Sequence, residues 1–173
     1  MLIFKKVFSF VAIFTFMLSI LFFPIQSKAE DNWDSYRWSD YNLNFQLPKN
    51  MTQGQNDSNR FVVKGDDLTF EIYPWKNTDV NEEDVAQEAY SQLEVKKPKI
   101  ILSDKRDFSG FSGYEILGEG LYKNKEVNFA VLGFIDPSSS ADFAVYIIYN
   151  PDSFDGVDIE SQIIENISNS SDL

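Results

Sequence analysis

Alternation between apolar and polar residues is the main pattern in this chain, and it predicts mostly β-strands. Leu43, Phe45 and Leu47 alternate with polar residues as far as Pro48, which is typical of a half-buried strand. Similar patterns predict strands over residues 60–64, 68–73, 100–108 and 143–150. The last of these is apolar on both faces, so both of its faces must be covered.

Two segments have helical periodicity instead. In residues 82–94, Asn81 is a suitable N-cap, acidic residues fill the first turn and the apolar side chains share one face. Residues 158–167 place their isoleucines on one face in the same way. Residues 49–59 are polar without a period and predict a surface loop, and residues 30–40 predict a loose start followed by a short edge strand. This order of elements predicts an α+β fold, with a mostly antiparallel sheet flanked by helices on both faces.

Glycines are concentrated before a predicted hairpin, at positions 110, 113, 118 and 120. A turn at Asn124-Lys125 would place Gly118 opposite Val131 and Gly120 opposite Phe129. We interpret these glycines, and Gly133, as space for bulky neighbours or for a covering helix. A phosphate loop is not indicated, because the chain has neither GxGxxG nor GxxxxGK and Glu119 would repel a phosphate.

The absence of histidine and cysteine from the chain excludes several kinds of chemistry. No Ser-His pair, thiol nucleophile or Cys/His zinc site can form. The sequence Gly110-Phe111-Ser112-Gly113 differs from a GxSxG nucleophile elbow, because no residue separates the serine from the second glycine. We therefore expect a non-enzymatic protein with no catalytic residues, no cofactor and no metal site.

Two alternatives use carboxylates alone and stay open. One is a glycosidase-like hydrolase with paired acids, since 27 acidic residues provide many possible pairs. The other is a calcium-binding module at the acidic turn formed by Asp152, Asp155, Asp158 and Glu160, although its spacing does not fit an EF-hand.

The first 29 residues have the layout of a signal peptide. Lys5 and Lys6 precede an uncharged apolar run over residues 7–23, and Ser27-Lys28-Ala29 resembles a cleavage site. An uncleaved anchor over residues 7–23 is the alternative. Residues 30–173 have the length of a single domain. We expect an exported protein, periplasmic or extracellular, that does not bind a membrane once the signal is removed.

Charge and aromatic residues indicate the kind of partner. Removal of Lys5, Lys6 and Lys28 leaves 12 basic and 27 acidic residues, a net charge of −15. Such a charge disfavours nucleic acid and favours solubility or a basic protein partner. Aromatic residues near the start of the domain, and where a predicted strand leaves the sheet at Pro74, are the candidate binding residues, because exposed aromatics mark interaction surfaces. They are Trp33, Tyr36, Trp38, Tyr73 and Trp75.

Taken together, these patterns resemble the PsbP-like family over about residues 36–168. The resemblance is carried by the following segments: Tyr41-Asn42-Leu43-Asn44-Phe45-Gln46-Leu47-Pro48, a helix with Ala86, Ala89 and Leu93, Gly113 before Tyr114-Glu115, Tyr146-Ile147-Ile148-Tyr149, and Ile163-Ile164-Glu165-Asn166-Ile167. It implies an antiparallel sheet flanked by helices and a non-enzymatic accessory, chaperone or docking role. Two departures are Met51, where the family often has a tryptophan, and the missing histidines that metal-associated members use.

Overall fold

The computed structural model describes residues 32–75, 80–139, 141–154 and 157–169, all of which belong to one compact unit, Asn32–Leu173. The predicted signal segment, including its apolar run over residues 7–23, lies outside the described residues. No helix in the described ranges is long and apolar enough to cross a membrane.

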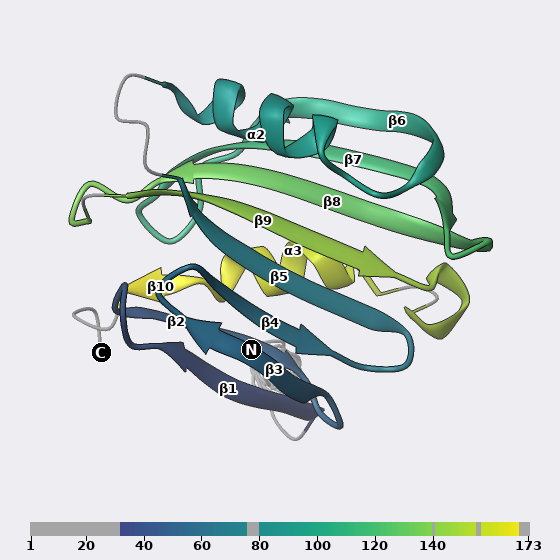
Figure 1. Ribbon diagram of the computed structural model, residues 1–173, viewed down its shortest axis with the longest axis horizontal. Coiled ribbons are helices and arrows are strands. Elements are labelled where there is room, and N and C mark those ends of the chain that lie inside the picture. Colours follow the sequence, from purple (N-terminus) through teal and green to yellow (C-terminus); the bar gives the residue numbers. More distant parts are fainter. Residues whose placement is uncertain (1–31, 76–79, 140, 155–156, 170–173) are drawn as a thin grey trace, which may run out of the picture. The chain divides into compact units, whose positions relative to one another are not determined.

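The strands of the described residues form two antiparallel sheets (Figure 1). The larger has seven strands in the order β3-β4-β5-β9-β8-β7-β6, and the smaller has three in the order β1-β2-β10. Their bounds are β1 Trp33–Trp38, β2 Leu43–Pro48, β3 Thr52–Asp57, β4 Arg60–Lys64, β5 Leu68–Trp75, β6 Lys96–Lys105, β7 Ser112–Tyr122, β8 Lys125–Ile135, β9 Asp142–Tyr149 and β10 Ser168–Asn169. The sequence predicts one sheet, so the separate small sheet is a finding of the structure.

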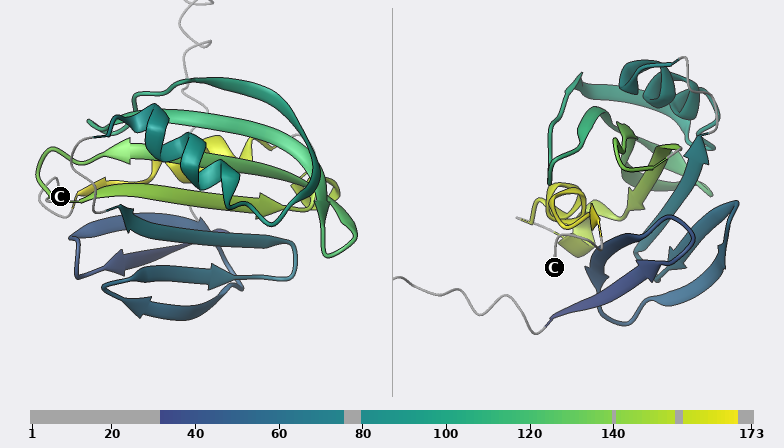
Figure 2. Two further views of the ribbon diagram at one scale, coloured as in Figure 1. Left: turned by 45° about the horizontal axis from the view of Figure 1, so that its top comes forward. Right: turned by 90° about the vertical axis from the view of Figure 1, so that its left-hand side faces the viewer.

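Helices cover both faces of the seven-stranded sheet (Figure 2). Helix α2, Glu82–Ser91, packs on β7, β8 and β9 through Val85, Ala86 and Ala89. The opposite face packs against helix α3, Ile159–Glu165, and the small sheet. This second core is rich in aromatic rings, and its largest fully buried members are Trp38, Phe45, Phe61, Phe70, Phe134 and Phe143. The predicted α+β fold class is confirmed, with the small sheet sharing the cover of one face.

The N-terminus of α2 follows the prediction, but its C-terminus does not. Asn81 and Asp84 form a capping box, in which the Asp84 backbone N–H donates to Asn81 Oδ1 at 2.9 Å. The helix ends at Ser91 rather than at residue 94, and β6 begins at Lys96 rather than at residue 100. The early start of β6 is invisible in the sequence because every residue of this strand is exposed, and the apolar alternation is therefore missing.

The predicted surface loop over residues 49–59 is wrong, because it contains β3. This polar strand pairs with β4 at Thr52↔Lys64, Gln53↔Val63, Asn56↔Phe61 and Asp57↔Arg60. It lies at the edge of the sheet, where backbone hydrogen bonds to β4 hold it without burial of apolar side chains. A strand of this kind gives no hydrophobic period to detect.

The β7–β8 hairpin turns one residue earlier than predicted. Lys123 and Asn124 are its two central residues, with φ values of 51° and 63°, as a type I′ turn requires. Gly118 therefore lies opposite Phe129 and Gly120 opposite Val127, two residues from the predicted pairing. A shift by two preserves the face of every side chain, so the interpretation of the glycines holds. A Cβ at Gly118 would lie against the Phe129 ring and 2.7 Å from the Lys99 carbonyl oxygen.

Gly133 provides the close approach between β8 and α2, and we expect Gly133→Ala to lower the free energy of unfolding by about 1–3 kcal/mol. A Cβ at this position would lie 2.6 Å from the Ala86 backbone nitrogen, so the helix would have to move. Urea unfolding measures the loss. The control is Gly54→Ala on β3, whose added Cβ would meet its nearest atom at 3.6 Å. If both variants were equally stable, the helix would not pack this closely on the strand.

Candidate functional site

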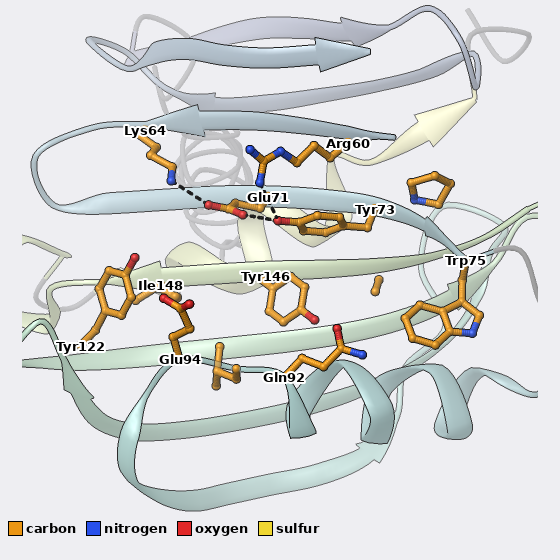
Figure 3. A pocket seen from close by; sticks show the side chains of 13 residues that line it. Arg60, Lys64, Glu71, Tyr73, Trp75, Gln92, Glu94, Tyr122, Tyr146 and Ile148 are labelled. Atoms are coloured by element: carbon orange, nitrogen blue, oxygen red, sulfur yellow. Dashed lines mark hydrogen bonds and ion pairs between the residues drawn. The ribbon is translucent and has the colours of Figure 1, made fainter. Parts of the chain in front are cut away.

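An open groove lies on the face of the large sheet beside α2 and has a volume of about 500 Å³ (Figure 3). Helix α2 is 10 residues long and covers β7, β8 and β9, so it leaves part of this face uncovered. One wall comes from β4 and β5, the floor from β9, and the other wall from the residues after α2 together with Tyr122 of β7. A second hollow, of about 550 Å³, shares Lys64, Tyr122 and Ile148 with the groove and is lined mainly by the β4–β5 turn, the β7–β8 turn and the end of β9.

A row of charged and hydroxyl groups lines the β4–β5 wall. Lys64 Nζ lies 2.8 Å from Glu71 Oε1, and the Tyr73 hydroxyl donates to Glu71 Oε2 at 2.5 Å. Arg60 Nη1 donates to the Tyr73 hydroxyl oxygen at 3.5 Å (Figure 3). Val62 pairs with Glu71 across the two strands, so the period of two places Arg60, Lys64 and Glu71 on one face.

Glu71 is held in its ionised form. Its partial burial tends to raise its pKa, but hydrogen bonds from Lys64 and Tyr73, with the charges of Lys64 and Arg60, outweigh burial and lower the pKa. A glycosidase acid needs the opposite, a carboxyl group whose pKa is raised. Glu94 also lines the groove, but Glu71 does not suit the acid role that the hydrolase alternative requires.

Aromatic rings line the groove on its floor and on its β5 wall. The rings of Tyr73 and Tyr146 meet edge to face with centroids 5.7 Å apart. The Tyr146 hydroxyl donates to the Ala89 carbonyl oxygen at 3.1 Å, which ties β9 to α2. Burial, with smaller effects from Tyr73 and Glu71, raises the pKa of Tyr146 to about 12, so the ring stays neutral. Trp75 lies at one end of the groove (Figure 3). The site thus offers ring surfaces bordered by fixed charges.

The structure divides the predicted aromatic residues between two places. Tyr73 and Trp75 are partly buried in the groove. Trp33 and Tyr36, also partly buried, pack against the core from the small sheet. Trp38 is 0% exposed, so its ring offers no surface to a partner. Whether the other four residues bind a partner stays a prediction.

Sequence reasoning missed the charged wall and most of the floor. Arg60, Lys64 and Glu71 flank the predicted hairpin turn at residues 65–67, and like-facing positions on paired strands can be counted from such a turn. Counting residues outward from the turn in this way would have shown that the three side chains lie on one face of the sheet. Nothing in the local sequence shows that α2 leaves this face open.

The acidic turn of the calcium alternative is only partly described. Asp155 lies outside the described residues, and Glu160 Oε2 accepts a hydrogen bond from the Tyr149 hydroxyl at 2.8 Å. Within the described ranges, no group of three or more histidine, cysteine, aspartate or glutamate side chains could hold a metal ion.

Comparison with solved structures identifies the fold. The solution structure of cyanobacterial PsbP (CyanoP) from Synechocystis sp. PCC 6803 matches with a TM-score of 0.54 and 12% identity, covering 76% of this chain and 91% of that one. The crystal structure of the Ran-binding protein Mog1p of Saccharomyces cerevisiae matches with a TM-score of 0.57 and 10% identity, covering 80% of this chain and 96% of that one. No family model and no curated protein matches the sequence. The resemblance to the PsbP-like family is confirmed at the level of the fold.

Proposed function

We propose that this chain, which has the Mog1/PsbP-like fold, is an exported, non-enzymatic binding or assembly factor that contacts another protein through the groove beside α2. Mog1p is a Ran-binding protein, which supports a binding role for this fold. The signal-like layout of residues 1–29 supports export to the periplasm or the exterior.

The observation that carries this proposal is the combination of aromatic rings and a charged wall in one open groove. Tyr73, Trp75 and Tyr122 supply large ring surfaces that lose little conformational entropy on binding. The Lys64–Glu71 pair adds fixed charges that can orient a partner. Aromatic anchors beside polar groups are typical of protein contact sites.

Site-specific photocrosslinking tests the proposal in the native cell envelope. A photoreactive amino acid replaces Trp75 in the groove, and in a matched variant it replaces Trp33, a partly buried tryptophan of the small sheet. We expect a covalent adduct with a distinct protein from position 75 and none from position 33. Adding Lys64→Glu should reduce the adduct from position 75, because it reverses one charge of the groove wall.

Two results would contradict the proposal. An adduct from position 33 alone would move the contact to the small sheet and remove the groove from the proposal. No adduct from either position would argue against a protein partner.

A further inference from the structure

A second surface feature lies on β6. Among the described residues, the exposed large hydrophobic side chains are Ile100, Ile101, Leu102 and Val157. Three of these are consecutive on β6, with exposed fractions of 47%, 63% and 43%. Single exposed aliphatic side chains are ordinary on protein surfaces, but a contiguous run on one strand marks an interaction site.

The same strand has an open edge. β6 ends the seven-stranded order and pairs only with β7 (Figure 1). Backbone N–H and C=O groups on its outer side therefore have no neighbouring strand in the described part of the chain. Such an edge can accept an added strand through backbone hydrogen bonds, while its side chains select the partner.

Features that protect a sheet edge from pairing with another strand occupy only part of β6. Pro98 lacks an N–H, and register shifts interrupt the pairing between Lys96 and Lys99 and again between Ile100 and Leu102. From Leu102 to Lys105 the pairing with β7 is regular, from Leu102↔Leu117 to Lys105↔Tyr114. The regular stretch overlaps the exposed apolar run at Leu102, so a partner strand that pairs there and continues past the register shift would also cover Ile100 and Ile101.

The charge of β6 is opposite to that of the rest of the chain. The strand carries Lys96, Lys97, Lys99 and Lys105 against a single acid, Asp104, in a chain of net charge −12. Lys99 pairs with Glu119 at 2.8 Å and Lys105 with Glu82 at 3.5 Å. Lys96 and Lys97 have no ion-pair partner among the described residues. Acidic side chains on an added strand would complement them.

We propose that the free edge of β6 binds an extended, acidic and apolar segment of a protein partner as an eighth strand of the large sheet. The partner's apolar side chains cover Ile100, Ile101 and Leu102, and its acids meet Lys96 and Lys97. This surface is separate from the groove, because none of these residues lines it.

A second copy of the chain is a poor occupant. Antiparallel pairing of two β6 strands centred on Ile101 would place Lys97 opposite Lys105. Centring the pair on Leu102 would place Lys99 opposite Lys105. Like charges directly opposite each other are destabilising, so these registers favour a different, acidic partner.

Peptide binding followed by NMR tests this proposal. The probes are ten-residue peptides: one alternates valine with glutamate, one alternates valine with lysine, and one is the acidic peptide with proline in its two central positions. We expect the acidic peptide to shift the backbone amides of β6 and β7. The basic and proline peptides should bind at least about tenfold more weakly, because they lose charge complementarity and backbone pairing respectively.

Two matched variants locate the contact. Ile101→Asn should weaken binding of the acidic peptide about tenfold or more, and Val157→Asn, at another exposed aliphatic residue, should leave it unchanged. Thermal melts establish that both variants fold. The proposal is overturned by equal binding of the acidic and basic peptides, by undiminished binding of the proline peptide, or by no binding of the acidic peptide at millimolar concentration. A dimer in sedimentation that Ile101→Asn dissociates would instead assign the edge to a second copy and also overturn it.

Discussion

Replacement of Arg106 by alanine is expected to lower the free energy of unfolding by about 3–5 kcal/mol at neutral pH, because it leaves a buried carboxylate without its counter-ion. Arg106 Nη1 lies 2.8 Å from Glu115 Oε2, and Glu115 is 2% exposed. Arg106 Nη2 also donates to Ser161 Oγ at 2.5 Å and to Glu165 Oε1 at 3.1 Å. The guanidinium thus joins β7 to α3.

The loss should depend on pH in a defined direction. Burial raises the pKa of Glu115 above its ordinary value even though Arg106 opposes this. A carboxyl group with a raised pKa in the folded state binds more protons there, so its effect on stability worsens as pH rises through that pKa. Without Arg106 the pKa rises further. Urea unfolding should therefore show a smaller loss at pH 4 than at pH 7 for Arg106→Ala.

Two control variants test whether the unpaired charge of Glu115 causes the loss of stability. Glu115→Gln should recover much of the stability of Arg106→Ala, because it removes the unpaired charge. Lys99→Ala breaks an ion pair whose side chains are 74% and 48% exposed, and it should cost less than about 1 kcal/mol. An equal loss at both pH values without recovery would mean that Glu115 is not the source of the instability.

Replacement of Trp38 by alanine is expected to lower the free energy of unfolding by about 3–5 kcal/mol, as for other buried aromatic residues. Its ring, 0% exposed, packs between the two sheets against Phe61 and Phe143. Its indole N–H donates to the Asp57 carbonyl oxygen at 2.8 Å, so truncation also removes that bond.

The other tryptophan of β1 provides the comparison. Trp33→Ala should cost clearly less than Trp38→Ala, because Trp33 is only partly buried. Trp38→Phe should fall between the two, since it keeps part of the packing and loses the hydrogen bond. Denaturant melts of the three variants measure the order. Equal costs for Trp33→Ala and Trp38→Ala would mean that Trp38 is not buried between the two sheets.

The sequence predicts those elements whose burial leaves a pattern. β2, β4, β5 and β9 were found because one or both of their faces are apolar, and the start of α2 because Asn81 caps it. β3 and the first half of β6 were missed because exposed edge strands are held by backbone bonds, which any residue can make. Alternation also shows which side chains are buried but not which sheet a strand joins, so the small sheet could not be predicted.

The candidate site was only partly predictable for a related reason. Tyr73 and Trp75 stand out because they flank Pro74 where a strand ends. Arg60, Lys64 and Glu71 become a site only because α2 stops at Ser91 and leaves the sheet beside them open. The hairpin register was wrong by two residues because both registers bury the same side chains.

The small sheet joins strands from both ends of the described chain. Ser168 and Asn169 of β10 pair with Asn44 and Leu43 of β2, across nearly the whole sequence. A pairing of such long sequence separation raises the contact order and forms late in folding. Because a chain is synthesised amino end first, the second edge of β2 cannot be closed until residues 168–169 have been made, so we expect β10 to complete the small sheet last.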